Sequence, residues 1–358
     1  MAFGTIFTLD VAAEAHKTTA ADIGEDALWT NLDGYFRAHN ELFNQAAEVI
    51  GERTTDRQRR FGGTAAVVMQ ELDEFGQPSA QKTAIPGYNV GFPLRRWGAA
   101  VQWTRFAFEN MTADEFQRQV NGITTADEDN LYAQICRAIY KPTNSTFTDT
   151  QQMPSLDLGI KALVNADSQP IPTGPSAVSF DGATHTHYLG ITTANTPLQA
   201  DYERLIEHVV EHFNTGSPVV YINRADEAKV KAFAGFTGYV DARLVDQRAA
   251  LVARTPLDIQ NLYDRAIGLL NGAEIIVKPW IKAGYPFAWV RGVEAPVVLR
   301  QPVALGAQSL RLVAQDENHP LRAHEWEHRY GVSVWNRLNG AVLDTVTGST
   351  TYTMPSGI

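Results

Sequence analysis

Three observations predict an α+β fold for this chain of 358 residues. A long helical pattern follows the capping pair Thr112 and Glu115 and ends at Pro142. Short strand and helix patterns alternate from about residue 160 to residue 289, and the final segment is again mainly strand-forming. With 44% hydrophobic residues, the chain can bury a large core and hold two or more domains.

Charge and cysteine content exclude several classes of protein. The 40 acidic residues outnumber the 30 basic ones, which argues against nucleic-acid binding as the main function, because phosphate contacts need clustered Lys and Arg. Cys136 is the only cysteine, so no intrachain disulfide forms and a reducing compartment is expected. Met1–Ala15 lacks the pattern of a signal peptide, and no window resembles a membrane span. A soluble protein made in the cytoplasm is therefore expected.

Residues 1–58 are expected to form an N-terminal arm. Ile6–Val11 reads as a short extended segment, and apolar residues from Leu28 to Ile50 recur at helical spacing. This helix is expected to need an apolar partner outside itself. The basic run at 51–60 is typical of a solvated linker, with the lining of a negatively charged interior as the alternative.

Residues 59–104 predict a long, two-stranded projection. Thr64–Met69 and Trp97–Phe108 are rich in strand formers, and glycines and prolines interrupt the sequence between them. Because a lone ribbon buries too little apolar surface to be stable, it is expected to lie on a neighbouring copy of the chain. Six residues are candidate assembly contacts, with ordinary intrachain core as the alternative: Leu32, Tyr35 and Phe43 in the arm, and Tyr88, Phe92 and Trp97 in the projection.

The rest of the chain is expected to form three further units. The long helix, which would span ~40 Å, is expected to act as a spine within residues 105–154. Residues 155–295 predict a compact α/β domain, with a strand at Pro218–Ile222 and helices at Ala225–Phe233 and Leu257–Leu270. It contains no phosphate-binding glycine loop and no nucleophile elbow. Residues 296–358 return as strands.

Two incompatible interpretations meet near the C-terminus. His324, Glu325 and His328 match the H-E-x-x-H pattern of zinc peptidases, in which two histidines on one helix face share a metal ion. Tyr330–Leu343 alternatively reads as a strand, a tight Asn-Gly turn and a second strand. The second interpretation is favoured, because a catalytic zinc needs a third protein ligand and no His, Glu or Cys follows His328.

Two further histidine patterns are expected to be structural. His208, Glu211 and His212 match the inverted H-x-x-E-H pattern, but they fall off the apolar stripe of their helix and are expected on a solvated polar face. His185 and His187 would point the same way from a strand, and no acidic or thiol partner lies close to them in sequence. We therefore expect no catalytic residue, metal or cofactor.

The order of these elements resembles the major capsid proteins of tailed bacteriophages with the Hong Kong ninety-seven fold. Several short runs are also similar to phage coat sequences, namely Thr184–Gly190 (THTHYLG), Glu211–Phe213 at a helix end, Val219–Asn223 and Arg329–Trp335. The resemblance covers nearly the whole chain. It implies a phage major capsid fold with an N-terminal arm, an extended β-hairpin loop, a peripheral domain containing the spine helix, and an α/β axial domain.

The same resemblance implies a coat protein and not an enzyme. Hexamers and pentamers of the chain would form an icosahedral shell around double-stranded DNA, without sequence-specific DNA binding and without a membrane. The chain would be located in the virion capsid and assembled in the host cytoplasm, with a portal and scaffold or cement proteins as partners. An encapsulin-like nanocompartment, a tail-tube or minor structural protein and a zinc peptidase are the alternatives.

The chain departs from the archetype of this family in two respects. Too few residues precede the projection for a long N-terminal scaffolding segment, so either a separate scaffold protein or the arm itself is expected to assist assembly. Lys82 and Asn336 or Asn339 have the residue types of the archetype's covalent crosslinks, but their positions do not match. Noncovalent cohesion is therefore expected.

Overall fold

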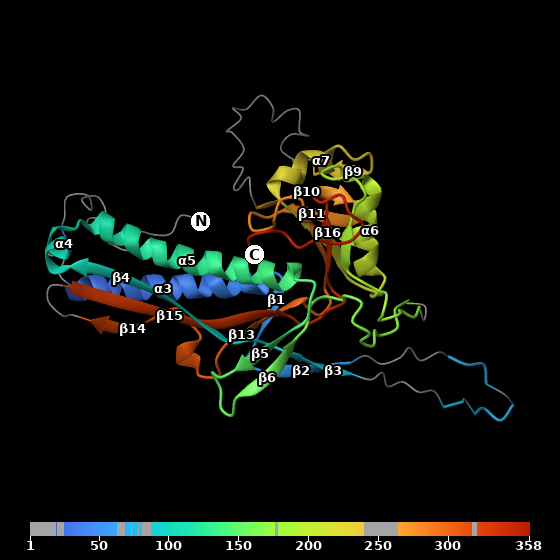
Figure 1. The fold of residues 1–358 in the computed structure, drawn as a ribbon, viewed down its shortest axis with the longest axis horizontal. Helices are drawn as coiled ribbons and strands as arrows, with labels where there is room; N and C mark the ends of the chain where they lie inside the picture. Colours follow the sequence, from blue (N-terminus) through green and yellow to red (C-terminus); the bar gives the residue numbers. More distant parts are fainter. Residues whose placement is uncertain are drawn as a thin grey trace, which may run out of the picture.

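The computed structural model describes residues 19, 25–62, 69–72, 74–77, 79–80, 87–175, 178–239, 264–316 and 321–358. Two sheets form the body of the molecule, each with helices packed against it, and a narrow ribbon projects from one side (Figure 1). The predicted α+β fold class is confirmed. The expected segment Ile6–Val11 and most of the expected strand Thr64–Met69 lie outside the described residues.

The first sheet is built around one long strand, β15 (Leu321–Val334). β4 (Arg95–Thr104) pairs antiparallel with residues 321–330 of β15, and β13 (Val297–Arg300) pairs antiparallel with residues 331–334. β14 (Arg311–Asp316) is antiparallel to β15, and β1 (Gly51–Thr54) is parallel to β13. Strands are thus present within residues 296–358, as the sequence predicts.

Two long helices, α3 (Glu25–Glu48) and α5 (Ala113–Tyr140), lie along this sheet (Figure 1). The predicted capping box is present at the start of α5, where Thr112 and Glu115 bond each other's backbone N–H groups. Leu32 and Phe36 of α3 share a buried core with Trp326 of β15, so this helix has the apolar partner that was expected outside itself, and the partner belongs to the same chain. The short helix α4 (Arg105–Asn110) connects β4 to α5.

A seven-stranded mixed sheet forms the second half of the body, in the order β7-β16-β12-β8-β11-β10-β9. Its strands are β7 (Tyr188–Gly190), β8 (Ser217–Ile222), β9 (Phe236–Gly238), β10 (Arg265–Leu270), β11 (Ala273–Val277), β12 (Phe287–Arg291) and β16 (Ala341–Asp344). α6 (Gln199–Val210) buries its apolar stripe against this sheet, as predicted. The predicted helix after β8 is present as a 3₁₀ turn, Arg224–Asp226, followed by α7 (Glu227–Lys231).

The prediction of a helix at 257–270 is wrong for the residues that the structure describes. Arg265–Leu270 is strand β10, which forms a hairpin with β11. Asn271 and Gly272 connect the two strands with φ values of 47° and 78°. Two successive residues with positive φ are typical of a type I′ turn, for which Asn-Gly is a preferred sequence. Gly272 therefore closes a hairpin turn and does not end a helix.

The hairpin predicted at 330–343 is also wrong, because its two strands lie in different sheets. β15 ends at Val334 in the first sheet, whereas β16 pairs with β12 and β7 in the second. Between them, the Asn339 side chain accepts a hydrogen bond from Val290 N at 2.7 Å and donates one to Val290 O at 3.0 Å. The Asn339 side chain thus continues the hydrogen bonding along one side of β12, at the point where the chain crosses between the sheets.

Strands β2 (Gln58–Phe61) and β3 (Tyr88–Gly91) form the base of the projecting ribbon (Figure 1). A two-stranded projection is therefore present, but its strands differ from those expected. Residues 97–104 belong to β4 and pair with β15, and residues 105–108 are in helix α4. A second hairpin, β5 (Ser145–Asp149) and β6 (Leu156–Ile160), lies next to β3.

Among the helices within the described ranges, none is both long enough and apolar enough to cross a membrane.

Substituting Gly331 by Ala is expected to lower the free energy of unfolding by about 1–3 kcal/mol, because an added Cβ would lie 2.0 Å from the Pro93 carbonyl oxygen. Urea unfolding followed by tryptophan fluorescence measures the change. Gly34→Ala is the matched control, because Gly34 is exposed within α3 and has open space around it. This control should raise stability by about 0.5–1 kcal/mol. Equal effects of the two substitutions would contradict the close approach of β15 to Pro93.

Candidate functional site

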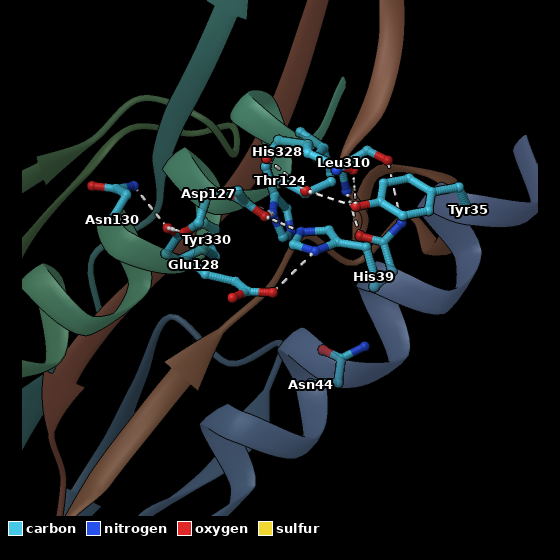
Figure 2. A network of polar contacts seen from close by, with 12 residues as sticks. Tyr35, His39, Asn44, Thr124, Asp127, Glu128, Asn130, Leu310, His328 and Tyr330 are labelled. Atoms are coloured by element: carbon cyan, nitrogen blue, oxygen red, sulfur yellow. Dashed lines mark hydrogen bonds and ion pairs between the residues drawn. The ribbon is translucent and has the colours of Figure 1, made fainter. Parts of the chain in front are cut away.

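A buried polar network joins α3, α5 and β15 (Figure 2). His39 Nε2 donates a hydrogen bond to Asp127 Oδ2 at 3.0 Å, and His328 Nδ1 donates to the same oxygen at 2.8 Å. The Glu128 carboxylate lies 3.5 Å from His39 Nδ1. Three elements distant in sequence therefore meet at one carboxylate.

The network changes the protonation of its members. Burial by itself lowers the pKa of His39, but its contacts with Asp127 and Glu128 outweigh burial and raise the pKa to about 9. Burial by itself raises the pKa of Asp127, whereas the two neighbouring histidines lower it below its ordinary value. Asp127 is thus ionised and His39 protonated at neutral pH, and the two form a buried ion pair.

The zinc-peptidase interpretation of this region is wrong. His324, Glu325 and His328 lie on strand β15, where successive side chains alternate between the two faces. His324 and His328 are buried, whereas Glu325 is exposed on the opposite face. At a rise of about 3.3 Å per residue, the two histidines are ~13 Å apart along the strand, too far to share one metal ion.

Buried arginines fix the base of the ribbon to the body. Arg300 donates to Phe92 O and to Asp149 Oδ2, both at 2.8 Å, and Arg57 Nε donates to the same Asp149 oxygen at 3.0 Å. A solvated linker at 51–60 is therefore not observed, because β1 and β2 occupy most of this run and Arg57 is ion-paired.

A second fully buried arginine, Arg337, lies in the same region. Its guanidinium donates to Ala162 O at 2.6 Å, to the Tyr88 hydroxyl at 3.0 Å and to Asp167 Oδ2 at 3.0 Å. Arg337 follows β15, and Tyr88 begins β3. The base of the ribbon is thus held by contacts with the segment that connects the two sheets.

The six candidate assembly residues all have contacts within their own chain. Leu32, Phe43 and Phe92 are at most 2% exposed, so they form intrachain core, the alternative that the sequence left open. The other three are partly buried. Tyr35 donates to Asn121 Oδ1, Tyr88 accepts from Arg337, and Trp97 Nε1 donates to Tyr330 O.

Three exposed apolar side chains lie on the outer part of the ribbon. Met69 is 93% exposed, Leu72 54% and Phe75 77%. The described residues of this segment lie at the far end of the projection, well away from both sheets (Figure 1). The six residues predicted from the sequence lie on α3 or between Tyr88 and Trp97, and these three were not among them. Their apolar character between glycines and prolines was the available signal.

The two remaining histidine patterns form one cluster. His185 and His187 precede β7, His212 follows α6, and their three Nε2 atoms lie 3.0–3.1 Å from one another. Glu211 Oε1 is 3.4 Å from His185 Nε2 and 3.9 Å from His212 Nε2. The expectations for these residues are thus corrected, since the His212 side chain is only 1% exposed instead of solvated, and His185 has an acidic partner in Glu211, directly after α6. The residues lie at spacings that can bind a metal ion.

Burial keeps these imidazoles neutral. It lowers the pKa of His187 well below the ordinary value, that of His212 to about 4, and that of His185 in the same direction. Neighbouring histidines add to the effect in each case. Neutral imidazole is the form of histidine that binds metals.

No protein-family model matches the sequence, and no curated protein matches it either. Among solved structures, a chain of Mycobacterium phage Patience is 18% identical, with a TM-score of 0.69 over 94% of each chain. A chain of the cyanophage A-1(L) capsid asymmetric unit is 12% identical, with a TM-score of 0.50 over 86% of this chain and 93% of that one. The SrpI encapsulin of Synechococcus elongatus has a TM-score of only 0.44 at 12% identity, over 87% of this chain and 90% of that one. The chain has the phage capsid fold, and the resemblance predicted from the sequence is confirmed.

The stability of the chain is expected to fall between pH 6.5 and 9. Because folding raises the pKa of His39, its contribution is fully present below pH 6.5 and is lost as the pH rises through about 9. Asp127→Asn should remove much of this decline and cost on the order of 3 kcal/mol at pH 6. Urea unfolding over this pH range measures both effects.

Asp129→Asn is the matched control for this experiment, because Asp129 is exposed on the same helix. It should retain the pH profile of the unsubstituted chain. Parallel profiles for the unsubstituted chain and Asp127→Asn above pH 6.5 would contradict a protonated His39 bound to Asp127.

Proposed function

We propose that this chain is a major capsid protein whose copies associate into an icosahedral shell enclosing phage double-stranded DNA. The observation that carries this proposal is the extent of the shared fold. The likeness to the Mycobacterium phage Patience chain covers 94% of both chains, so one architecture accounts for nearly the whole length. The likeness to a chain of a cyanophage capsid supports the same role.

The projecting ribbon supplies a physical reason for association. Met69, Leu72 and Phe75 expose apolar surface on a segment that lies away from the body of its own chain (Figure 1). Such surface is stabilised when a neighbouring molecule covers it. The neighbour in this proposal is a second copy of the chain, and the ribbon of one subunit lies on the body of the next.

Rigid anchoring of the ribbon favours this mode of association. Arg300, Arg57 and Asp149 form ion pairs at the base, where side-chain burial reduces competition from water. A ribbon with a fixed base loses less conformational entropy on binding than a free one would. Its direction also sets where the neighbour must lie, as a closed shell requires.

The charge of the chain fits enclosure of DNA without binding it tightly. A formal net charge of −10 repels the phosphate backbone, so packaged DNA is not held by the shell. In this proposal the shell consists of hexamers and pentamers and forms the virion capsid, assembled in the host cytoplasm with a portal and scaffold or cement proteins. The role is structural and needs no catalytic residue. Within the described segments, the peptidase pattern lies on a strand.

The triple variant Met69→Ser, Leu72→Ser, Phe75→Ser is expected to abolish shell formation. Each substitution removes apolar area whose burial is worth on the order of 1–3 kcal/mol, and the loss repeats at every subunit contact. Negative-stain microscopy and sedimentation of the expressed chain measure the assembled fraction. It should fall at least about tenfold.

Two controls accompany this variant. Glu71→Ser and Glu74→Ser change exposed polar residues on the same segment and should leave assembly intact. The triple variant should unfold at the same urea concentration as the unsubstituted chain, because the changed side chains are exposed in the single chain. Full assembly of the triple variant would overturn the role of the ribbon. Particles that enclose protein cargo and no DNA would instead identify a nanocompartment.

A further inference from the structure

The side chain of His187 is held in an orientation that leaves one nitrogen free to bind a ligand. Its backbone N–H donates to Val164 O at 2.8 Å, and its carbonyl accepts from Val342 N at 2.9 Å. Its Nδ1 donates to Gly340 O at 2.7 Å, because a carbonyl oxygen can only accept. The proton of the neutral ring is therefore on Nδ1, and Nε2 carries a lone pair that points at the other two histidines.

The hydrogen bonds among the three Nε2 atoms cannot all be satisfied. In each ring, Nε2 either carries a proton and donates or carries a lone pair and accepts. Because three Nε2 atoms share only two possible states, at least two of the atoms must be in the same state. Two lone pairs or two N–H groups then face each other at about 3 Å in a buried site, which is unfavourable. This holds for every choice of tautomer and for every protonation state.

A cation between the rings removes this conflict, since all three nitrogens then act as donors of a lone pair. We propose that His185, His187, His212 and Glu211 form a four-coordinate site for a divalent transition-metal ion, with Zn²⁺ as the best fit. Three imidazoles and one carboxylate are ligands that Zn²⁺ binds well, and four protein ligands close the site in the manner of a structural zinc.

The distances agree with this assignment. Nitrogen atoms 3.0–3.1 Å apart form a nearly equilateral triangle. At the usual Zn–N distance of about 2.0–2.1 Å, an ion equidistant from them lies about 1 Å out of their plane. The Glu211 carboxylate oxygen lies within 4.8 Å of all three nitrogens, and a shift of about 1 Å brings it to bonding distance.

Surrounding residues support the ligands in the way typical of metal sites. The bond from His187 Nδ1 to Gly340 O fixes the ring, as second-shell carbonyls do for zinc-bound histidines. His208 Nδ1 lies 3.1 Å from Glu211 Oε1 and orients the carboxylate. The Phe180 ring covers the cluster from one side, with centroids 5.0 Å from His185 and 4.3 Å from His212.

The bound ion would join two segments that are remote in sequence. His185 and His187 lie before the edge strand β7, whereas Glu211 and His212 follow α6. The ion therefore stabilises the attachment of α6 to the edge of the seven-stranded sheet. This role concerns the folded chain itself, and it stands or falls separately from shell formation.

The test uses the full chain, first stripped with a chelator and then supplied with Zn²⁺. After gel filtration, elemental analysis should find about one Zn²⁺ per chain, and the melting temperature should rise with added Zn²⁺. Competition with a chromophoric chelator should show at least about tenfold weaker binding for His185→Ala and for His212→Ala. Co²⁺ in place of Zn²⁺ should give the intense visible absorption of four-coordinate cobalt.

Glu207→Gln is the matched control, because it changes an exposed carboxylate of α6 that lies outside the cluster, and it should keep about one Zn²⁺ per chain. Should the alanine variants fail to fold, Glu211→Gln replaces the partly exposed ligand with an isostere and should weaken binding and change the cobalt spectrum. The proposal is overturned if the unsubstituted chain retains no zinc after gel filtration. It is equally overturned if the ligand variants bind zinc as tightly as the unsubstituted chain does.

Discussion

The five-stranded sheet and the two long helices on it depend on the burial of one face of the long strand β15. Its side chains alternate, so that Trp326, His328 and Tyr330 face the helices while Glu325 and Arg329 face the other way. A register shift of one residue would turn charged side chains toward α3 and α5, which makes the observed pairing with β4 strongly preferred. Asp127 adds specificity, because a buried carboxylate is tolerated only where His39 and His328 satisfy it.

This arrangement separates the surfaces that fold the chain from the surface proposed to join it to other copies. The helix α3 is covered by the chain's own sheet and helix α5, and the base of the ribbon is fixed by Arg300 and Arg337. Apolar surface remains exposed at Met69, Leu72 and Phe75, beyond the reach of either sheet. In the proposed shell, association through the ribbon would add to a body that is already folded.

Local signals in the sequence predicted the elements that local physics determines. The capping box at Thr112 and the apolar stripes of α5 and α6 were predicted, because each depends on residues within a few turns. The Asn-Gly pair at Asn339 led to the wrong prediction of a hairpin turn, because its side-chain amide bonds Val290 instead. The Asn-Gly pair at Asn271 does form a hairpin turn, and this turn was not predicted. Which strands pair is decided by contacts between distant residues, and no local pattern contains that information. The histidine cluster was missed for the same reason, since His185 and His212 belong to separate patterns that only the folded sheet brings together.

In the proposed shell, each chain folds its own two sheets and helices, and a second copy covers the exposed apolar side chains of the ribbon. Electron cryomicroscopy of particles assembled from the expressed chain shows where these side chains lie. We expect closed shells in which Met69, Leu72 and Phe75 of each subunit are buried against the body of a neighbour. A monodisperse single chain at high concentration, or shells in which these three side chains remain in solvent, would rule out association through the ribbon.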